Sequence, residues 1–189
     1  MRTGVMCYCL WILPVVALSS NNSETLLEAL LIRSRSFRDI ASIIDILKKY
    51  PRIIAYVPSL NPVNPGNIKR ISSDFGFRFH PVDQVLKKHE GIDIAANLAT
   101  PIHCTASGFV QIAAAHVRGY GNYIQIKHKY GFETRYGHLS KIYVKAGHLV
   151  KKGDIIGFIG STGKSTGCHL HYEIRKYGIG VAPKAFLQI

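Results

Sequence analysis

Apolar and polar side chains alternate strictly through residues 168–174, near the end of the chain. The apolar positions of this run are Leu170, Tyr172 and Ile174. The polar positions between them are His169, His171 and Glu173. Because successive side chains of a strand point to opposite faces, this period predicts a half-buried strand that turns both histidines to one side.

Two further runs, residues 122–128 and 133–139, flank the short segment Lys129-Tyr-Gly131. Strand-like runs joined by a few residues that include glycine are typical of a β-hairpin. Tyr136 and His138 are two positions apart in the second run, so we expect a phenol beside an imidazole on one face. These patterns predict a mainly β domain built on an antiparallel sheet.

His89 and Asp93 are four positions apart in the segment His89-Glu-Gly-Ile-Asp93. On an extended strand, an even spacing puts two side chains on the same face. We therefore expect a strand that presents an imidazole and a carboxylate together.

Residues 23–50 have a different period, because their apolar positions recur at helical spacing. These positions are Leu26, Leu27, Leu30, Leu31, Phe37, Ile40, Ile44 and Leu47. Asn22 or Ser23 can cap a helix start and Pro51 can end one, which predicts an N-terminal appendage made of one amphipathic helix that packs on the domain. Residues 51–70 are rich in proline, asparagine and glycine, which predicts an extended linker.

Residues 1–19 are typical of an export signal. Arg2 gives a basic start, Val5 to Leu18 is almost entirely apolar, and Ala17-Leu-Ser19 places small residues at a cleavage position. The apolar run is shorter than the about 20 residues that span a bilayer, so a cleaved signal peptide is favoured over a membrane anchor that tethers the protein. We expect an exported protein of the periplasm or cell envelope, in which Cys104 and Cys168 are unpaired.

The chain of 189 residues carries a formal net charge of +13, which favours anionic polymers as partners. Residues 61–189 hold 17 Lys and Arg against 7 Asp and Glu, so most of the excess lies after the linker. No helix-turn-helix, zinc-finger or aromatic ribonucleoprotein motif is present, and nucleic acid is therefore not expected as a partner. Residues 160–167 resemble a phosphate-binding loop, but Phe158 replaces the first glycine and a predicted strand follows, which favours a tight turn instead.

The histidines and Asp93 together have the composition of a catalytic metal site. Zinc in a hydrolase usually takes three protein ligands and keeps one position for water. His89, Asp93 and either His169 or His171 would complete that set, and the two remaining histidines, one of which is His138, would serve proton transfer. A two-histidine, one-carboxylate iron(II) centre has the same ligand count, but the two extra histidines favour hydrolysis.

The order of short motifs along the chain resembles that of the lysostaphin/LytM-type zinc metallopeptidases. The similarity runs from about Ile71 to Leu187. The blocks that carry it are Ser73-Asp-Phe-Gly-Phe-Arg-Phe-His-Pro81, His89-Glu-Gly-Ile-Asp-Ile-Ala95, Thr100-Pro-Ile102, Gly119-Tyr-Gly-Asn122, Tyr136-Gly-His-Leu-Ser140, Val150-Lys-Lys-Gly-Asp-Ile-Ile-Gly157 and Gly160-Ser-Thr-Gly-Lys-Ser-Thr-Gly-Cys-His-Leu-His-Tyr-Glu-Ile174.

This resemblance implies a duplicated hybrid motif, a barrel-like antiparallel β domain over residues 71–189, and zinc-dependent hydrolysis of amide bonds in peptidoglycan stem peptides or cross-links. It implies that His89, Asp93 and His171 bind Zn²⁺ and that His138 and His169 are the catalytic pair. Tyr136 is a further candidate helper.

Two departures from the family pattern affect loops rather than ligands. Cys168 stands where the family often has proline, and Ala99 where it often has glycine. Some relatives place a tyrosine before the first ligand to hold the oxyanion, whereas this chain has Phe79-His80 there. The alternative function is a catalytically silent LytM-type module that binds the cell wall or activates a separate amidase. Such modules commonly lose site residues, and here all five are present.

Overall fold

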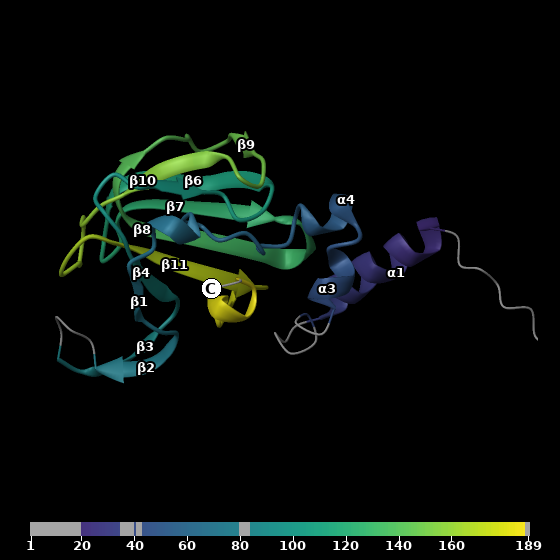
Figure 1. The fold of residues 1–189 in the computed structure, drawn as a ribbon, viewed down its shortest axis with the longest axis horizontal. Helices are drawn as coiled ribbons and strands as arrows, with labels where there is room; N and C mark the ends of the chain where they lie inside the picture. Colours follow the sequence, from purple (N-terminus) through teal and green to yellow (C-terminus); the bar gives the residue numbers. More distant parts are fainter. Residues whose placement is uncertain (1–19, 35–39, 41–42, 80–83, 188–189) are drawn as a thin grey trace, which may run out of the picture.

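The computed structural model describes residues 20–34, 40, 43–79 and 84–187, and these form a mainly β protein with short helices at the amino-terminal end (Figure 1). The helices are α1 (Ser20–Arg33), α3 (Ile44–Leu47) and α4 (Pro51–Ile54), with 3-10 turns η1 (Pro65–Asn67), η2 (Lys129–Gly131) and η3 (Pro183–Ala185). The first six strands are β1 (Arg70–Ser73), β2 (Gly76–Phe79), β3 (Leu86–His89), β4 (Ile92–Ala95), β5 (Pro101–His103) and β6 (Gly108–Val117). The others are β7 (Gly121–His128), β8 (Phe132–Ile142), β9 (Leu149–Val150), β10 (Ile155–Ile159), β11 (His169–Lys176) and β12 (Ile179–Val181).

The main sheet has the strand order β1-β4-β11-β8-β7-β6-β9, and every pairing between its described strands is antiparallel. β10 pairs with β8 and β5, and β12 pairs with β11. β2 and β3 form a separate two-stranded sheet that extends from the main sheet beside β1 (Figure 1). The expected antiparallel β fold is confirmed, and within the described residues the sheet stays open rather than closing into a barrel.

Burial along β11 agrees with the prediction on one face of the strand. Leu170, Tyr172 and Ile174 are fully buried in the core, as expected. The expectation of a half-buried strand is wrong, because His171 and Glu173 on the polar face are only 8% and 0% exposed. The expected hairpin is present as β7 and β8, and its connection is the 3-10 turn η2. Two consecutive residues of this turn, Tyr130 and Gly131, have positive φ angles of 58° and 75°, which is how so short a connection reverses the chain.

The prediction of a single helix over residues 23–50 is wrong. α1 begins at Ser20 and ends at Arg33, Ser34 is not helical, and α3 is a separate helix that begins at Ile44. After α1, the backbone N–H and the hydroxyl of Ser34 both donate to the carbonyl of Leu30, the kind of local bond by which serine competes with helix continuation. Pro51 does not end a helix but opens α4, because the first position of a helix needs no N–H donor.

Residues 51–70 pack against the sheet instead of forming a free linker. Ile53, Val57 and Val63 are buried in the same core as the strands. The carbonyls of Ala55 and Pro62 accept backbone hydrogen bonds, each of 2.7 Å, from the loop after β5 and from β5 itself. This segment is therefore part of the β domain, because it shares both the core and backbone hydrogen bonds with it.

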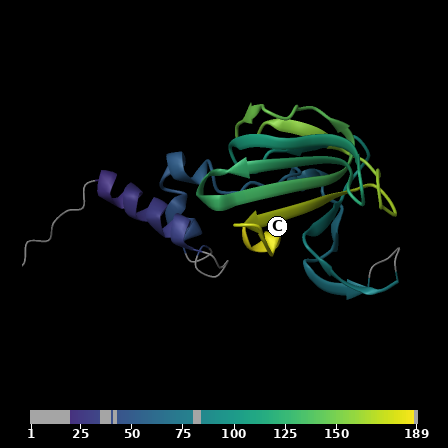
Figure 2. The ribbon, with the colours of Figure 1, turned by 180° about the vertical axis from the view of Figure 1, so that it is seen from behind.

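α1 lies at the end of β11 where that strand finishes, far from its first residues (Figures 1 and 2). Leu27 and Leu31 form its buried face. The hydroxyl of Tyr177, just after β11, donates to the Ile32 carbonyl of α1 at 2.6 Å. No helix among residues 20–34, 40, 43–79 and 84–187 is long and apolar enough to cross a membrane. The expected signal or anchor, residues 1–19, lies outside the described residues.

Candidate metal centre

Three buried side chains from three strands converge at one end of the sheet. The donors are Nε2 of His89 on β3, Oδ1 of Asp93 on β4 and Nδ1 of His171 on β11. The distances are 3.0 Å from His89 to His171, 3.0 Å from His171 to Asp93 and 3.2 Å from His89 to Asp93. Two imidazole nitrogens and a carboxylate oxygen at such separations form a donor set suited to a divalent metal ion.

His89 and Asp93 do not share one strand, contrary to the expectation from their spacing. His89 ends β3 in the small sheet, while Asp93 lies in β4 of the main sheet. Gly91 allows the change of sheet, because a Cβ atom there would lie only 2.3 Å from the Tyr172 carbonyl oxygen. In the main sheet Asp93 is the direct partner of His171, so backbone register brings this carboxylate to the imidazole.

Each of the three side chains also uses its other polar atom to contact the protein. Nδ1 of His89 donates to the Asp74 carbonyl at 2.8 Å, and Nε2 of His171 donates to Oε1 of Glu173 at 3.1 Å. Oδ2 of Asp93 accepts from the Arg78 guanidinium at 3.1 Å. These contacts fix the rings and leave one lone pair of each group directed at the common point, as in protein metal sites.

The surrounding charges favour a cation at this point. Burial alone lowers the pKa of His171, but hydrogen bonds to Asp93 and Glu173 and the charges of both carboxylates raise it to about 9. Burial raises the pKa of Asp93, yet the hydrogen bonds from His171 and His89 outweigh it and hold this pKa well below its usual range. The pKa of Glu173 falls to about 2 because the contact with His171 outweighs burial. A site that attracts a proton this strongly fits a metal ion equally well.

His138 and His169 lie beside the three-residue cluster, with their ring centroids 4.7 Å apart. Nε2 of His169 is 3.7 Å from Oδ1 of Asp93, and the His138 ring centroid is 5.9 Å from that of His171. Nδ1 of His138 donates to the Thr162 carbonyl and Nδ1 of His169 to the Gly167 carbonyl, each at 2.8 Å. Each ring therefore keeps its Nε2 lone pair for the cleft.

Tyr136 does not lie on the same face as His138, so the expectation of a phenol beside this imidazole is wrong. Tyr136 is fully buried, and its hydroxyl bonds to Thr105 in the core. At His138 the backbone φ is +67°, in the left-handed region, which breaks the alternation of β8 and turns this ring to the opposite face. The positive φ is held by two contacts of His138 with neighbouring loops, N–H to the Tyr120 carbonyl and the ring to Thr162.

The glycine-rich segment before β11 forms the expected tight turn. Gly163 has a φ of +70°, and a Cβ atom on it would lie 2.3 Å from the backbone nitrogen of Gly121. Thr162 in this turn accepts from His138 and donates through its hydroxyl to the Leu139 carbonyl at 2.8 Å. The turn therefore leads into the histidine strand and also fixes the position of His138.

The phenol at the site belongs to Tyr120, which the alternation pattern did not identify. Its hydroxyl donates to Oε1 of Glu173 at 2.5 Å, and its ring centroid is 5.6 Å from that of His171. Burial, followed by the Glu173 charge, raises the pKa of Tyr120 to about 12, so this phenol stays a donor. The Gly119-Tyr-Gly-Asn122 motif was the available signal. In the segment considered for an oxyanion partner, Phe79 is 73% exposed and His80 lies outside the described residues.

These groups line one cleft of about 730 Å³ that contains all five predicted site residues. Its lining also includes Arg70, Ser72, Ser73, Arg78, Lys87, Lys88, Glu90, Arg118, Gly119, Tyr120, Lys164, Ser165, Thr166 and Glu173.

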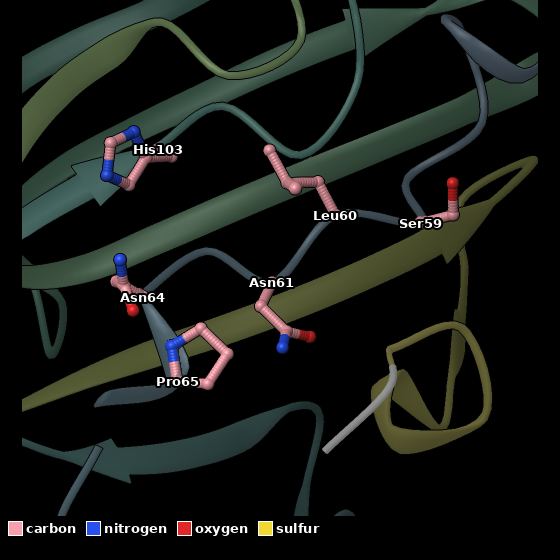
Figure 3. Close-up of a pocket in the computed structure, with 6 residues that line it drawn as sticks. All are labelled: Ser59, Leu60, Asn61, Asn64, Pro65 and His103. Carbon is pink, nitrogen blue, oxygen red and sulfur yellow. The ribbon is translucent and has the colours of Figure 1, made fainter. Parts of the chain in front are cut away.

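A smaller hollow of about 310 Å³ between residues 59–65 and His103 shares no lining residue with the cleft (Figure 3). Nδ1 of His103 bonds to the Gly153 carbonyl and Nδ1 of His128 to the Ser107 carbonyl, and neither histidine lines the cleft. Cys104 and Cys168 are unpaired.

Comparison with known proteins places the cleft within a characterised family. The family described as Peptidase family M23 matches residues 87–183. The chain is 46% identical over 121 residues to the DD-carboxypeptidase/endopeptidase Mpg of Neisseria meningitidis, covering 64% of this chain and 28% of that protein. It is 40% identical over 122 residues to the peptidoglycan DD-endopeptidase ShyC of Vibrio cholerae, again covering 64% of this chain and 28% of the relative.

Solved structures agree with this assignment. A zinc-containing peptidase from Vibrio cholerae is similar with a TM-score of 0.58 and 39% identity, over 66% of this chain and 38% of that one. The catalytic domain of lysostaphin, an antimicrobial peptidase of Staphylococcus simulans, has a TM-score of 0.56 and 33% identity, over 62% of this chain and 90% of that domain. The matched region thus corresponds to a catalytic domain, whereas it spans little more than a quarter of the Neisseria and Vibrio relatives named above.

Proposed function

Since the chain belongs to peptidase family M23, we propose that it is a zinc-dependent endopeptidase that hydrolyses amide bonds in the stem peptides or cross-links of peptidoglycan. The observation that carries the proposal is the convergence of His89, Asp93, His138, His169 and His171 in one open cleft. Relatives named peptidoglycan DD-endopeptidases support the substrate class.

The proposed zinc ligands are Nε2 of His89, Oδ1 of Asp93 and Nδ1 of His171. Bound zinc in such a site polarises a carbonyl group and makes water a nucleophile at neutral pH. Asp74, Arg78 and Glu173 would hold the three ligands in position through the contacts described above.

His138 and His169 are the proposed proton-transfer pair. Burial, then the neighbouring His169, lowers the pKa of His138 to about 4, so its ring is neutral near pH 7 and its Nε2 can accept a proton. With both Nδ1 atoms held by backbone carbonyls, one Nε2 would take a proton from the attacking water while the other, once protonated, would donate to the oxygen or nitrogen on which charge develops.

Peptidoglycan as substrate would require the protein to act outside the cytoplasm, in the periplasm or cell envelope. The export signal expected over residues 1–19 is consistent with that location. The net charge of +13 would concentrate the protein on an anionic wall polymer. The alternative within this proposal is that residues 1–19 are not cleaved and tether the protein to the membrane.

The test is incubation of the purified full chain with isolated sacculi, followed by mass spectrometry of the released muropeptides. We expect new amine and carboxylate ends within stem peptides or cross-links, loss of activity with a chelator, and its return with zinc. Binding to sacculi without any cleavage, in protein that holds one zinc, would contradict the proposal and support the silent module. The His169→Ala variant is the matched inactive control, because it should keep the ligand set.

A further inference from the structure

The cleft walls carry more positive than negative charge. Among the residues that the structure describes, six cationic side chains line the cleft, namely Arg70, Arg78, Lys87, Lys88, Arg118 and Lys164. Three carboxylates of the same described part line it, namely Glu90, Asp93 and Glu173. Asp93 and Glu173 are already engaged by His171, and Glu90 pairs with Lys88 at 3.0 Å. The acids are therefore used within the protein, and the potential left for a ligand is positive.

Arg70 and Arg118 differ from Arg78 and Lys88, which are paired within the protein. Arg78 contacts Asp93, and Lys88 contacts Glu90. Arg70 and Arg118 are exposed, and among the described residues they have no ion pair. A planar guanidinium that the protein itself does not use suits two-point binding of a carboxylate.

Sheet topology places Arg70 and Arg118 on either side of the histidines. Arg70 on β1 is the direct partner of Ala95 on β4, and Ala95 is the direct partner of His169 on β11. Directly opposed residues share a face, so Arg70 lies on the His169 face two strand spacings away, or about 10 Å. Arg118 lies beyond β8, in the turn from β6 to β7.

The turn that carries Arg118 is firmly held. The Tyr120 carbonyl accepts from the His138 backbone at 2.7 Å, and the Gly119 carbonyl accepts from that of Lys164 at 2.8 Å. The close approach of Gly163 to Gly121 joins the same two loops. The backbone that carries Arg118 is therefore fixed relative to the proposed catalytic histidines, so only the Arg118 side chain has to be ordered when a ligand binds.

We propose that the cleft selects acidic peptides carrying a free carboxylate on each side of the scissile amide, one bound by Arg70 and the other by Arg118. This inference rests on the proposed function and narrows its substrate. Replacing a carboxylate by a carboxamide removes the charge but keeps the size, so the enzyme should discriminate against amidated stem peptides. Because both arginines contact parts of the substrate away from the reacting bond, the difference should appear mainly in KM.

The experiment compares two synthetic cross-linked dimers of stem peptides, identical except that the carboxyl groups flanking the cross-link are free in one and carboxamides in the other. For the full chain we expect kcat/KM to be at least about tenfold higher for the acid dimer. Arg70→Gln and Arg118→Gln should each lower kcat/KM more for the acid dimer than for the amidated dimer, and so reduce this preference. A merely structural role would lower kcat/KM for both dimers by the same factor and keep the preference. Lys145→Gln, an exposed cation outside the cleft lining, is the matched control and should keep the full preference.

Equal turnover of the two dimers would overturn the inference, and so would a preference that survives in both arginine variants. Calorimetric binding of each dimer to the His169→Ala variant separates this inference from the proposed function. If neither dimer is cleaved by the wild-type chain but the acid dimer still binds at least about tenfold more tightly, hydrolysis of this bond fails while carboxylate selection stands. Equal binding of the two dimers would overturn carboxylate selection whatever the turnover.

Discussion

The two ends of β11 each bury polar side chains, but they satisfy them differently. At the first end, His169, His171 and Glu173 face other ionisable side chains. At the last end, Lys176 is 1% exposed and donates its ammonium group to the backbone carbonyls of Leu31 and Tyr130. The same strand thus joins the candidate metal centre to the point where α1 docks (Figure 1).

This contrast separates a binding site from a structural contact. The Lys176 amine has its acceptors within the fold, and two aromatic rings, Phe132 and Tyr177, lie 4.5 Å from it. At the candidate metal centre, donor atoms of His89, Asp93 and His171 approach one another at 3.0 to 3.2 Å with no backbone group between them. Burial is common to both ends, but convergence of lone pairs on one point is found only at the first, and convergence indicates a ligand.

The largest effect should come from the proposed proton-transfer pair, His138 and His169. We expect His138→Ala and His169→Ala to lower kcat by about 10²- to 10⁴-fold, because each removes an acid or base without removing a proposed ligand. Kinetics on sacculi together with zinc analysis checks this. If His169→Ala lost its zinc while His171→Ala kept it, the roles of those two histidines would be exchanged.

Glu173 is expected to act through His171. Glu173→Gln removes the charge that faces Nε2 of His171, and a change of this kind costs about 10- to 100-fold in metal affinity. Competition with a zinc chelator of known affinity measures the change. Asp154→Asn is the control, because Asp154 accepts from the Lys151 backbone and does not line the cleft, and this variant should leave the affinity unchanged.

Lys176 should affect stability and not activity. Lys176→Met leaves the Leu31 and Tyr130 carbonyls without this donor, so we expect the free energy of unfolding to fall by about 2 kcal/mol or more. Zinc content and turnover per folded molecule should stay at the wild-type level. Urea titration and kinetics on the same samples test both parts. A loss of turnover without a loss of stability would show that the two ends of β11 are coupled.

A smaller effect concerns His128, which is held by Ser107 and Thr134 away from the cleft. Burial lowers its pKa to about 4, below the value of about 6.5 in an unfolded chain, so the unfolded state binds more protons as the pH falls. This difference in pKa has no effect on stability above about pH 7, but it lowers the free energy of unfolding by about 1 kcal/mol at about pH 5.5. His128→Gln should therefore lose less stability than the wild type between about pH 7.5 and pH 5.5 in urea titrations. Parallel losses would contradict this account of His128.

Local periodicity was enough to predict the parts of the site that depend on one strand or turn. The His169 to Ile174 alternation predicted which side chains of β11 share a face and that the apolar ones are buried, and the five site residues expected from the motif order all line the cleft. Features that depend on tertiary contacts were not accessible. The break at Gly91 is required by the Tyr172 carbonyl of another strand, and the positive φ of His138 by loops that follow β6 and β10.

The amino-terminal segment also combines features that local periodicity predicts with features that depend on tertiary contacts. Apolar spacing over residues 23–50 has the helical period throughout, yet α1 ends at Arg33. Ser34 bonds back to Leu30 there, and Lys176 and Tyr177 of the β domain donate hydrogen bonds to the carbonyls of the helix end. Proline and glycine in residues 51–70 suggested a linker, but burial of Val57 and Val63 depends on the sheet beneath them. Tyr120 was overlooked because its role depends on Glu173, 53 positions away in sequence.

The central claim is that His89, Asp93 and His171 form a zinc site, and elemental analysis of purified protein tests it most directly. We expect about one zinc per chain in the wild type and in Lys176→Met, and a large loss in His89→Ala, Asp93→Ala and His171→Ala, with circular dichroism showing that each variant is folded. One full equivalent of zinc retained in all three ligand variants, or no zinc in the folded wild-type protein after incubation with the metal, would contradict the claim.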